Sequence, residues 1–205
     1  KQDYEKSIQN LNRAIELNPH LEFAYLQRGV TYNEIKKYDL AINDLKEAEK
    51  LNPNSRLTLS AIGVYYGKIG NFDLAIEYYQ KVIQKEKILD DMMNLTEAYI
   101  CKKDFTNAEK WANESYFVST DVRNKVMSKF LLVTTFILSN KEYKLELKSI
   151  IDILRENSDF DVGGWSFEEL LGCLADTSIP QEKTEVVKKI IALLKKEIRP
   201  ENFSI

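Results

Sequence analysis

Apolar residues recur along this chain with the spacing of α-helices, and short polar turns interrupt them at regular intervals. The pattern itself repeats about every 34 residues, and the aromatic residue that follows a polar turn marks each copy at Tyr4, Tyr38, Phe72 and Phe105. The tripeptide Leu-Asn-Pro also occurs twice, at residues 17–19 and 51–53. A helical pattern with this period predicts an array of stacked helical hairpins, because one hairpin cannot bury its apolar face alone.

Small residues recur in the same frame. In the copies that begin at Glu22 and Arg56, Gly29 and Gly63 are the eighth residues, and alanine is the twentieth in both. A small residue on each helix of a hairpin lets the two backbones approach closely while the aromatic residues fill the space beside them. The combination resembles the tetratricopeptide repeat family. The resemblance implies an all-α, right-handed solenoid of helical hairpins.

The period also predicts how the chain is organised. We expect residues 1–156 to form the solenoid, with a half repeat at 1–21, repeats at 22–55, 56–88 and 89–122, and a degenerate hairpin at 123–156. The period is lost after Asn157, where residues 157–205 read as a C-terminal helical cap. Ser166 to Glu169 resembles a capping box that opens a short helix. A second helix carries an apolar stripe from Val186 to Ile198.

One face of the first helix in each repeat is the candidate binding surface. At about 100° per residue, positions 2, 5, 9, 12 and 13 lie opposite the packing face, and the resemblance implies that this side lines a concave groove that binds peptides. We call the candidate residues the inner positions. They are Phe23, Leu26, Val30, Asn33, Leu57, Ser60, Val64, Lys68, Asp90, Met93, Glu97, Leu131 and Thr135.

The inner positions carry more apolar residues than a solvated helix face normally has. They therefore predict a groove for an extended or amphipathic segment, or else a face that the chain's own C-terminal helices or a neighbouring chain cover. Lys68 and Asn33 are the only inner residues suited to hold a terminal carboxylate, and Glu97 would repel one. This makes a chaperone-type carboxylate clamp a poor fit.

Composition narrows the function further. A net charge of −3 gives no general attraction to nucleic acid, and the sequence has no apolar run long enough to enter a membrane as a helix. Cys101 and Cys173 have no metal-ligand spacing, so we expect two free thiols in a reducing, cytoplasmic environment. With His20 as the single histidine and no phosphate loop or nucleophile motif, we expect neither an enzyme nor a bound cofactor or metal.

The sequence therefore predicts a non-catalytic scaffold or adaptor for protein–protein interaction. The alternative is the regulatory or sensor portion of a larger enzyme or signalling protein, because the chain begins in the middle of a repeat. The same feature leaves Leu11, Ala14 and Ile15 without the preceding helix against which they would pack. We therefore expect that homodimers could form through this N-terminal edge.

Overall fold

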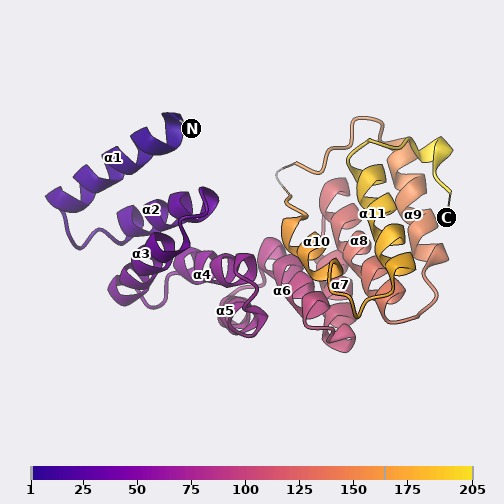
Figure 1. Cartoon of the computed structure of the whole chain (residues 1–205), viewed down its shortest axis with the longest axis horizontal. Coiled ribbons are helices and arrows are strands. Elements are labelled where there is room, and N and C mark those ends of the chain that lie inside the picture. The colour runs from indigo at the N-terminus through magenta and orange to yellow at the C-terminus, as the bar shows by residue number, and fades with distance from the viewer. Residues whose placement is uncertain (1, 164, 205) are drawn as a thin grey trace. The chain divides into compact units, whose positions relative to one another are not determined.

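The computed structural model describes residues 2–163 and 165–204, and all of their regular secondary structure is helical (Figure 1). This confirms the all-α class expected from the sequence. The elements are α1 (Gln2–Leu17), α2 (Glu22–Glu34), α3 (Tyr38–Leu51), α4 (Arg56–Lys68), α5 (Phe72–Lys85), α6 (Leu89–Cys101), α7 (Phe105–Val118), α8 (Val122–Leu138), α9 (Lys144–Glu156), α10 (Glu168–Leu174), α11 (Gln181–Leu194) and the 3₁₀ helix η1 (Pro200–Asn202).

The helices belong to two compact units, residues 1–87 and 88–205, which we call the N-terminal and C-terminal units. Within the first, α1 packs against α2, α2 against α3, and α4 against α5. Within the second, α6 packs against α7, and α8 packs against both α7 and α9. Consecutive helices thus form hairpins, as expected of a helical-hairpin solenoid. The boundary between the units lies within the region assigned to the solenoid, and the finer division into repeats stays a prediction.

Close approach of paired helices explains the recurring glycines. A Cβ atom at Gly29 would lie 2.9 Å from Cγ of Leu45, and one at Gly63 would lie 2.6 Å from Cε1 of Tyr79. Neither distance leaves room for a methyl group, so each glycine lets the first helix of its hairpin meet a large buried side chain of the second. By contrast, a Cβ atom at Gly67 would meet nothing within 4 Å.

Arg28 occupies a position where the repeat pattern usually has an apolar residue, and the structure gives it partners. Its Nε and Nη2 atoms donate to the two carboxylate oxygens of Asp44, each at 2.7 Å, and Nη1 donates to Oδ1 of Asn12 at 2.7 Å. The side chains of Arg28 and Asp44 are 19% and 10% exposed. Because the pair is bidentate and largely buried, it ties α1, α2 and α3 together in place of an apolar contact.

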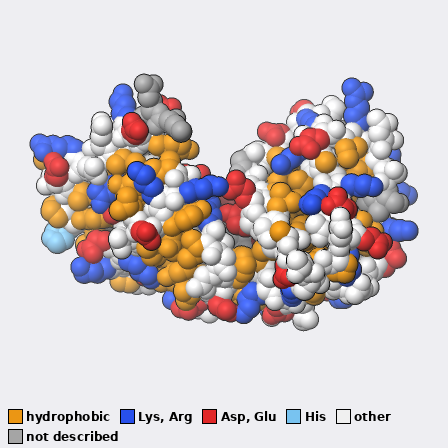
Figure 2. Space-filling model, in the orientation of Figure 1, with side chains coloured by type: hydrophobic (Ala, Val, Ile, Leu, Met, Phe, Trp, Pro, Cys, Tyr) orange, Lys and Arg blue, Asp and Glu red, His pale blue; other side chains and the backbone are white. Residues whose placement is uncertain are grey.

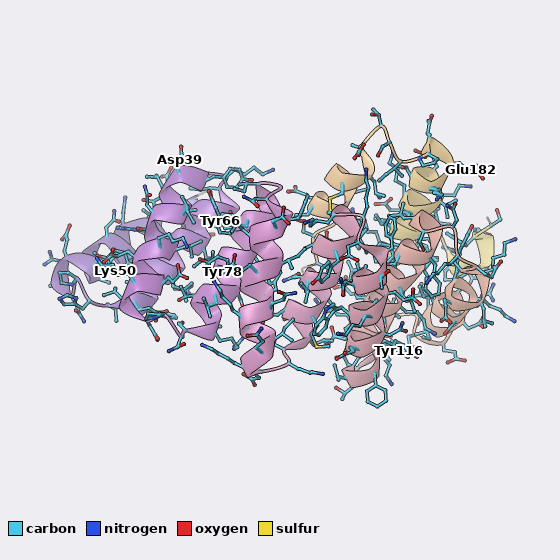
Figure 3. All side chains as sticks on the ribbon, turned by 90° about the horizontal axis from the view of Figure 1, so that it is seen from below. Asp39, Lys50, Tyr66, Tyr78, Tyr116 and Glu182 are labelled. Atoms are coloured by element: carbon cyan, nitrogen blue, oxygen red, sulfur yellow. A yellow bond between two sulfur atoms is a disulfide. The ribbon has the colours of Figure 1, made fainter. Side chains whose placement is uncertain are left out.

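Tyrosine rings contact one another in the N-terminal unit, where Figure 3 labels Tyr66 and Tyr78. The ring of Tyr65 lies 6.3 Å from that of Tyr38 and 5.2 Å from that of Tyr66, and Tyr66 stacks on Tyr78 at 5.8 Å. The Tyr78 hydroxyl accepts a hydrogen bond from Lys46. Such ring contacts add to the stability that burial alone supplies.

The turns inside the hairpins share one backbone conformation. Gly70 has a φ of +76°, as expected for a left-handed C-terminal cap. Lys36, Lys103 and Asn140 adopt φ values of 59°, 61° and 61° at the corresponding turns. Gly70, and to a lesser degree Asn140, indicate this conformation in the sequence, because left-handed backbone is common for glycine, less so for asparagine and rare for lysine.

The C-terminal unit is built around α8, which contacts α6, α7, α9 and α11. Phe130, Leu131 and Val133 on α8 are completely buried. Val187, Ile190, Ile191 and Leu194 of α11 are buried as the apolar stripe predicted, although the helix ends at Leu194 rather than continuing to Ile198.

The capping box expected at Ser166 is only partly formed. Oγ of Ser166 accepts a hydrogen bond from the Glu168 amide at 3.2 Å, but the residue that caps α10 is Phe167.

The expectation of two free thiols is wrong. Cys101 at the end of α6 and Cys173 in α10 form a disulfide, with their Cα atoms 5.3 Å apart. The two cysteines are separated by 72 residues in the sequence. They meet because α10 folds back onto α6, a contact that the repeat pattern does not encode.

Candidate functional site: the inner helix faces

The inner positions of the N-terminal unit lie on α2 and α4. Phe23 and Leu57, which occupy equivalent places 34 residues apart, are 55% and 50% exposed. Val30, Ser60, Val64 and Lys68 are half-buried, whereas Leu26 and Asn33 are buried. Apolar side chains reach the surface of this unit between charged groups (Figure 2). The structure therefore leaves two large apolar side chains open to solvent on this face.

Lys68, the charged residue among the inner positions of this unit, forms an ion pair. Nζ of Lys68 lies 2.9 Å from Oε1 of Glu34, so the two residues link α4 to α2. An ion pair here weakens the case for a carboxylate clamp further, because a ligand carboxylate would compete with Glu34 for Lys68.

Two buried polar atoms occur on the same helices. Oδ1 of Asn33 and Oγ of Ser60 have no hydrogen-bond partner among the described residues. An unmet buried acceptor or hydroxyl costs free energy, so these two side chains lower the stability of the unit.

The inner positions of the C-terminal unit differ, because all but one are covered. Asp90 is exposed, whereas Met93, Glu97, Leu131 and Thr135 are 1%, 8%, 0% and 0% exposed. In this unit α10 packs against α6 and α11 packs against α8 (Figure 1). The sequence left open whether a partner segment, a neighbouring chain or the chain's own C-terminal helices cover the inner positions. On α6 and α8 it is the C-terminal helices α10 and α11 that lie against them.

Glu97 is an unusual residue to find beneath such a cover. Its pKa is raised from 4.5 to about 8, mainly because burial disfavours the charged form and also because of the nearby charge of Glu169, while a hydrogen bond from the Leu170 backbone amide opposes the rise. Its Oε1 atom has no partner among the described residues. Near neutral pH the carboxyl group is thus largely protonated, which avoids a buried charge.

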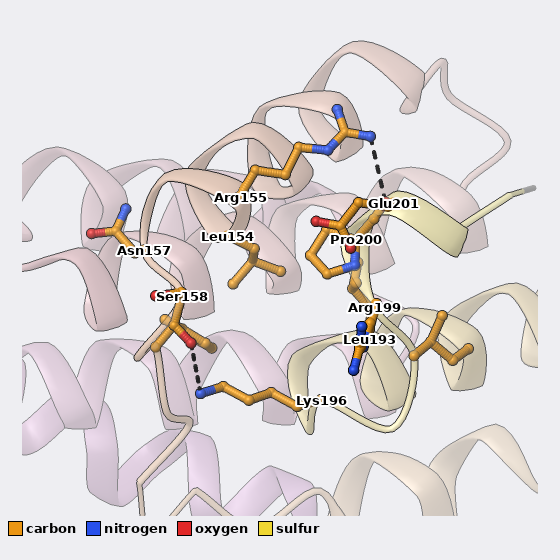
Figure 4. A pocket seen from close by; sticks show the side chains of 11 residues that line it. Leu154, Arg155, Asn157, Ser158, Leu193, Lys196, Arg199, Pro200 and Glu201 are labelled. Atoms are coloured by element: carbon orange, nitrogen blue, oxygen red, sulfur yellow. Dashed lines mark hydrogen bonds between the residues drawn. The ribbon is translucent and has the colours of Figure 1, made fainter.

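A cavity of about 420 Å³ lies elsewhere in the C-terminal unit, where the ends of α9 and α11 meet η1 (Figure 4). Nζ of Lys196 donates to the Ser158 carbonyl at 3.1 Å, and Nη2 of Arg155 donates to the Pro200 carbonyl at 3.4 Å. Leu154, Phe160 and Leu193 form part of its apolar lining. Sequence reasoning missed this cavity, because it forms where α9, at the end of the predicted solenoid, meets segments that follow the repeats. Lys196 and Arg155 are both engaged by backbone carbonyls of residues that line it.

No group of metal-binding side chains was found among the residues that the structure describes. Within the same residues, no helix has both the length and the apolar character that crossing a bilayer requires.

Comparison with known proteins identifies the repeats. A family model described as "Psidin, N-terminal TPR repeats region" matches residues 1–135. The chain belongs to this tetratricopeptide repeat family. The resemblance stated from the glycine, alanine and aromatic positions is therefore confirmed.

Solved structures show the same fold at low sequence identity. PilW, described as a widely conserved type IV pilus biogenesis factor, superposes with a TM-score of 0.67 at 15% identity, over 94% of this chain and 86% of its own. PilF of Pseudomonas aeruginosa gives 0.66 at 13% identity, over 94% and 84%. The structure of Naa15/Naa10 bound to HypK-THB gives 0.52 at 15% identity, over 92% of this chain but 32% of the other. No curated protein sequence matches the chain.

Proposed function

We propose that this tetratricopeptide protein is a non-catalytic adaptor whose N-terminal unit binds an amphipathic or extended segment of a partner protein across α2 and α4. The observation that carries the proposal is the exposure of Phe23 and Leu57 at equivalent places on these helices. Tetratricopeptide arrays serve as protein-interaction scaffolds, and a large apolar side chain repeated on adjacent helices supplies the anchors that such binding needs.

The polar groups fit the same partner. Besides Phe23 and Leu57, this face carries the uncharged polar residue Ser60, which is half-buried. The pairing of Lys68 with Glu34 means that the partner need not carry a charge at that point. We therefore infer a mainly apolar recognition segment with uncharged polar residues between its anchors.

We still propose that the protein is cytoplasmic. Free thiols no longer support this compartment, because the two cysteines form a disulfide. A cytoplasmic disulfide is typically reversible and redox-sensing rather than a permanent brace. This assignment can be checked by measuring the oxidation state of the two cysteines in intact cells with a thiol-alkylating mass tag.

The adaptor proposal can be tested with a displayed library of 16-residue peptides panned against the purified chain. The test variant is Phe23→Asp combined with Leu57→Asp, which places charges on exposed positions and should leave stability within about 0.5 kcal/mol of the original. The control is Phe117→Asp, because Phe117 is 88% exposed at the end of α7, a helix of the C-terminal unit that carries none of the inner positions.

We expect the unmodified chain and Phe117→Asp to enrich the same apolar peptides and the double variant to lose that enrichment at least tenfold. Equal enrichment by the double variant would remove α2 and α4 from the binding mechanism.

A further inference from the structure

The cover over the C-terminal unit consists partly of a very short helix. α10 has seven residues, of which Leu170 and Leu174 are buried. Phe167, the capping residue just before the helix, is also buried, so the three side chains follow one another at spacings of three and four. Phe167 meets Phe130 of α8 edge-on, with the ring centres 5.6 Å apart. On its other side Glu168 and Gly172 are exposed. α10 is therefore an amphipathic helix whose apolar side packs against other helices.

The helical conformation of α10 depends on its packing against the neighbouring helices. Helices shorter than about twelve residues are marginal in water, so seven residues do not hold the conformation alone. The Leu170 amide belongs to the first turn of α10, where amides lack a partner within the helix, and its hydrogen bond goes to the Glu97 carboxyl of α6. The structure thus shows which ligand this face accepts, namely a short helix with Phe and Leu anchors and an amide for Glu97.

One covalent bond and several weaker contacts hold α10 in place. The disulfide between Cys101 and Cys173 is the covalent bond, and both cysteines are half-buried. Beyond α10, Nζ of Lys103 binds Asp176 at 2.8 Å, but both side chains are more than 40% exposed, which makes this a weak attachment.

The segments on either side of α10 are not helical. Residues 157–163 and 165–167 precede it and residues 175–180 follow it as loop and turns. α11 has its own attachment to α8, because Nζ of Lys183 donates to the Leu138 carbonyl at 2.9 Å. One hydrogen bond joins α11 to α10, from Oγ1 of Thr184 to the Leu174 carbonyl at 3.3 Å. Release of α10 would therefore break this bond but leave the packing of α11 on α8.

We propose that the face of α6 and α8 beneath α10 is a second helix-binding site, that the disulfide keeps α10 in it, and that reduction lets an amphipathic partner helix with Phe-x-x-Leu-x-x-x-Leu anchors replace α10. The inference extends the proposed adaptor function to a different set of inner positions, and it rests on that function.

The redox step is an ordinary exchange with a dithiol reductant. One thiolate of the dithiol attacks a sulfur of the Cys101–Cys173 bond and forms a mixed disulfide, and the second thiol of the reductant then resolves it. The chain gains two electrons and two protons and ends with two thiols, while the dithiol becomes a disulfide.

The test uses the full chain and a fluorescent peptide of residues 165–177 in which Cys173 is replaced by serine. A tethered α10 competes at an effective concentration in the millimolar range, so the site must be vacated for a free peptide to bind well. The test protein therefore combines Cys101→Ser, Cys173→Ser and Leu170→Asp. The control peptide carries Leu170→Asp in addition.

We expect the triple variant to bind the peptide at least tenfold more tightly than the oxidised chain does, and the control peptide to bind neither. The same binding must persist when Phe23→Asp and Leu57→Asp are added, which separates this site from the proposed adaptor face. Equal binding by the oxidised chain and the triple variant, or no binding by a triple variant of unchanged helicity, would overturn the inference.

A second measurement avoids substitutions. Hydrogen exchange on the unmodified chain, with and without a dithiol, should show protection of the α10 amides falling at least tenfold on reduction while α8 and α11 stay protected. If α10 stays protected, or if all three helices lose protection together, α10 is not a releasable ligand and the proposal fails.

Discussion

Buried Glu97 makes the stability of the C-terminal unit fall as the pH rises. Its pKa is about 8 in the folded protein against an ordinary value of 4.5, so between these values the folded chain holds a proton that the unfolded chain has released. Folding stability then decreases with pH across this window, and it levels off above pH 8, where both states are ionised. At 1.36 kcal/mol per pKa unit the whole loss is roughly 5 kcal/mol, of which roughly 3 kcal/mol has occurred by pH 7.

Tryptophan fluorescence makes this measurable in a chain with two compact units. Both tryptophans, Trp111 and Trp165, lie in the C-terminal unit, so urea unfolding followed by their fluorescence reports on that unit alone. A loss of roughly 5 kcal/mol is a large part of the total stability of a domain. The urea midpoint should therefore drop markedly between pH 5 and pH 8.5, with the disulfide kept intact throughout.

Glu97→Gln isolates the cause, because glutamine keeps the size and the acceptor for the Leu170 amide but cannot ionise. We expect its stability to be nearly constant across the same pH range and to exceed that of the unmodified chain at pH 8.5. Glu182→Gln, at an exposed residue of α11, controls for the removal of one charge (Figure 3). Parallel pH profiles for Glu97→Gln and the unmodified chain would refute the assignment.

Much of the fold could be read from the repeat pattern. The recurring aromatics Tyr38, Phe72 and Phe105 are the first residues of α3, α5 and α7, and the predicted register starts at Glu22 and Arg56 are the first residues of α2 and α4. The pattern predicts where these helices begin because each repeat uses similar side chains for the same packing contact. At the fourth hairpin α8 begins at Val122, one residue before the predicted start at 123.

The repeat pattern could not predict which segment, if any, covers the inner positions of a given helix. Leu57 in the N-terminal unit and Leu131 in the C-terminal unit are both apolar residues at inner positions, yet the first is 50% exposed and the second is completely buried. The difference arises from α10 and α11, which lie outside the repeats. The period describes contacts between neighbours in an array and contains no information about a segment that folds back onto it.

Pairs that are distant in sequence escaped prediction for the same reason. Arg28 stood out as a departure from the repeat pattern, but Asp44 could not be named as its partner without the packing of α2 on α3. The disulfide is the larger case, because the absence of a metal-ligand spacing argued for free thiols while the return of α10 to α6 brought Cys101 and Cys173 together.

Four further substitutions test the packing of the N-terminal unit, and all can be followed by urea unfolding with circular dichroism. Gly63→Ala should destabilise it by about 2 kcal/mol, because the new methyl group meets Tyr79, whereas Gly67→Ala on the same helix has open space and should stabilise it by about 0.5 kcal/mol. Asp44→Ala leaves the largely buried guanidinium of Arg28 without its carboxylate and should cost roughly 3 kcal/mol. Adding Arg28→Met to Asp44→Ala should recover most of that loss, since an apolar residue is usual at this repeat position. If the double variant is no more stable than Asp44→Ala, the cost does not come from the unpaired charge.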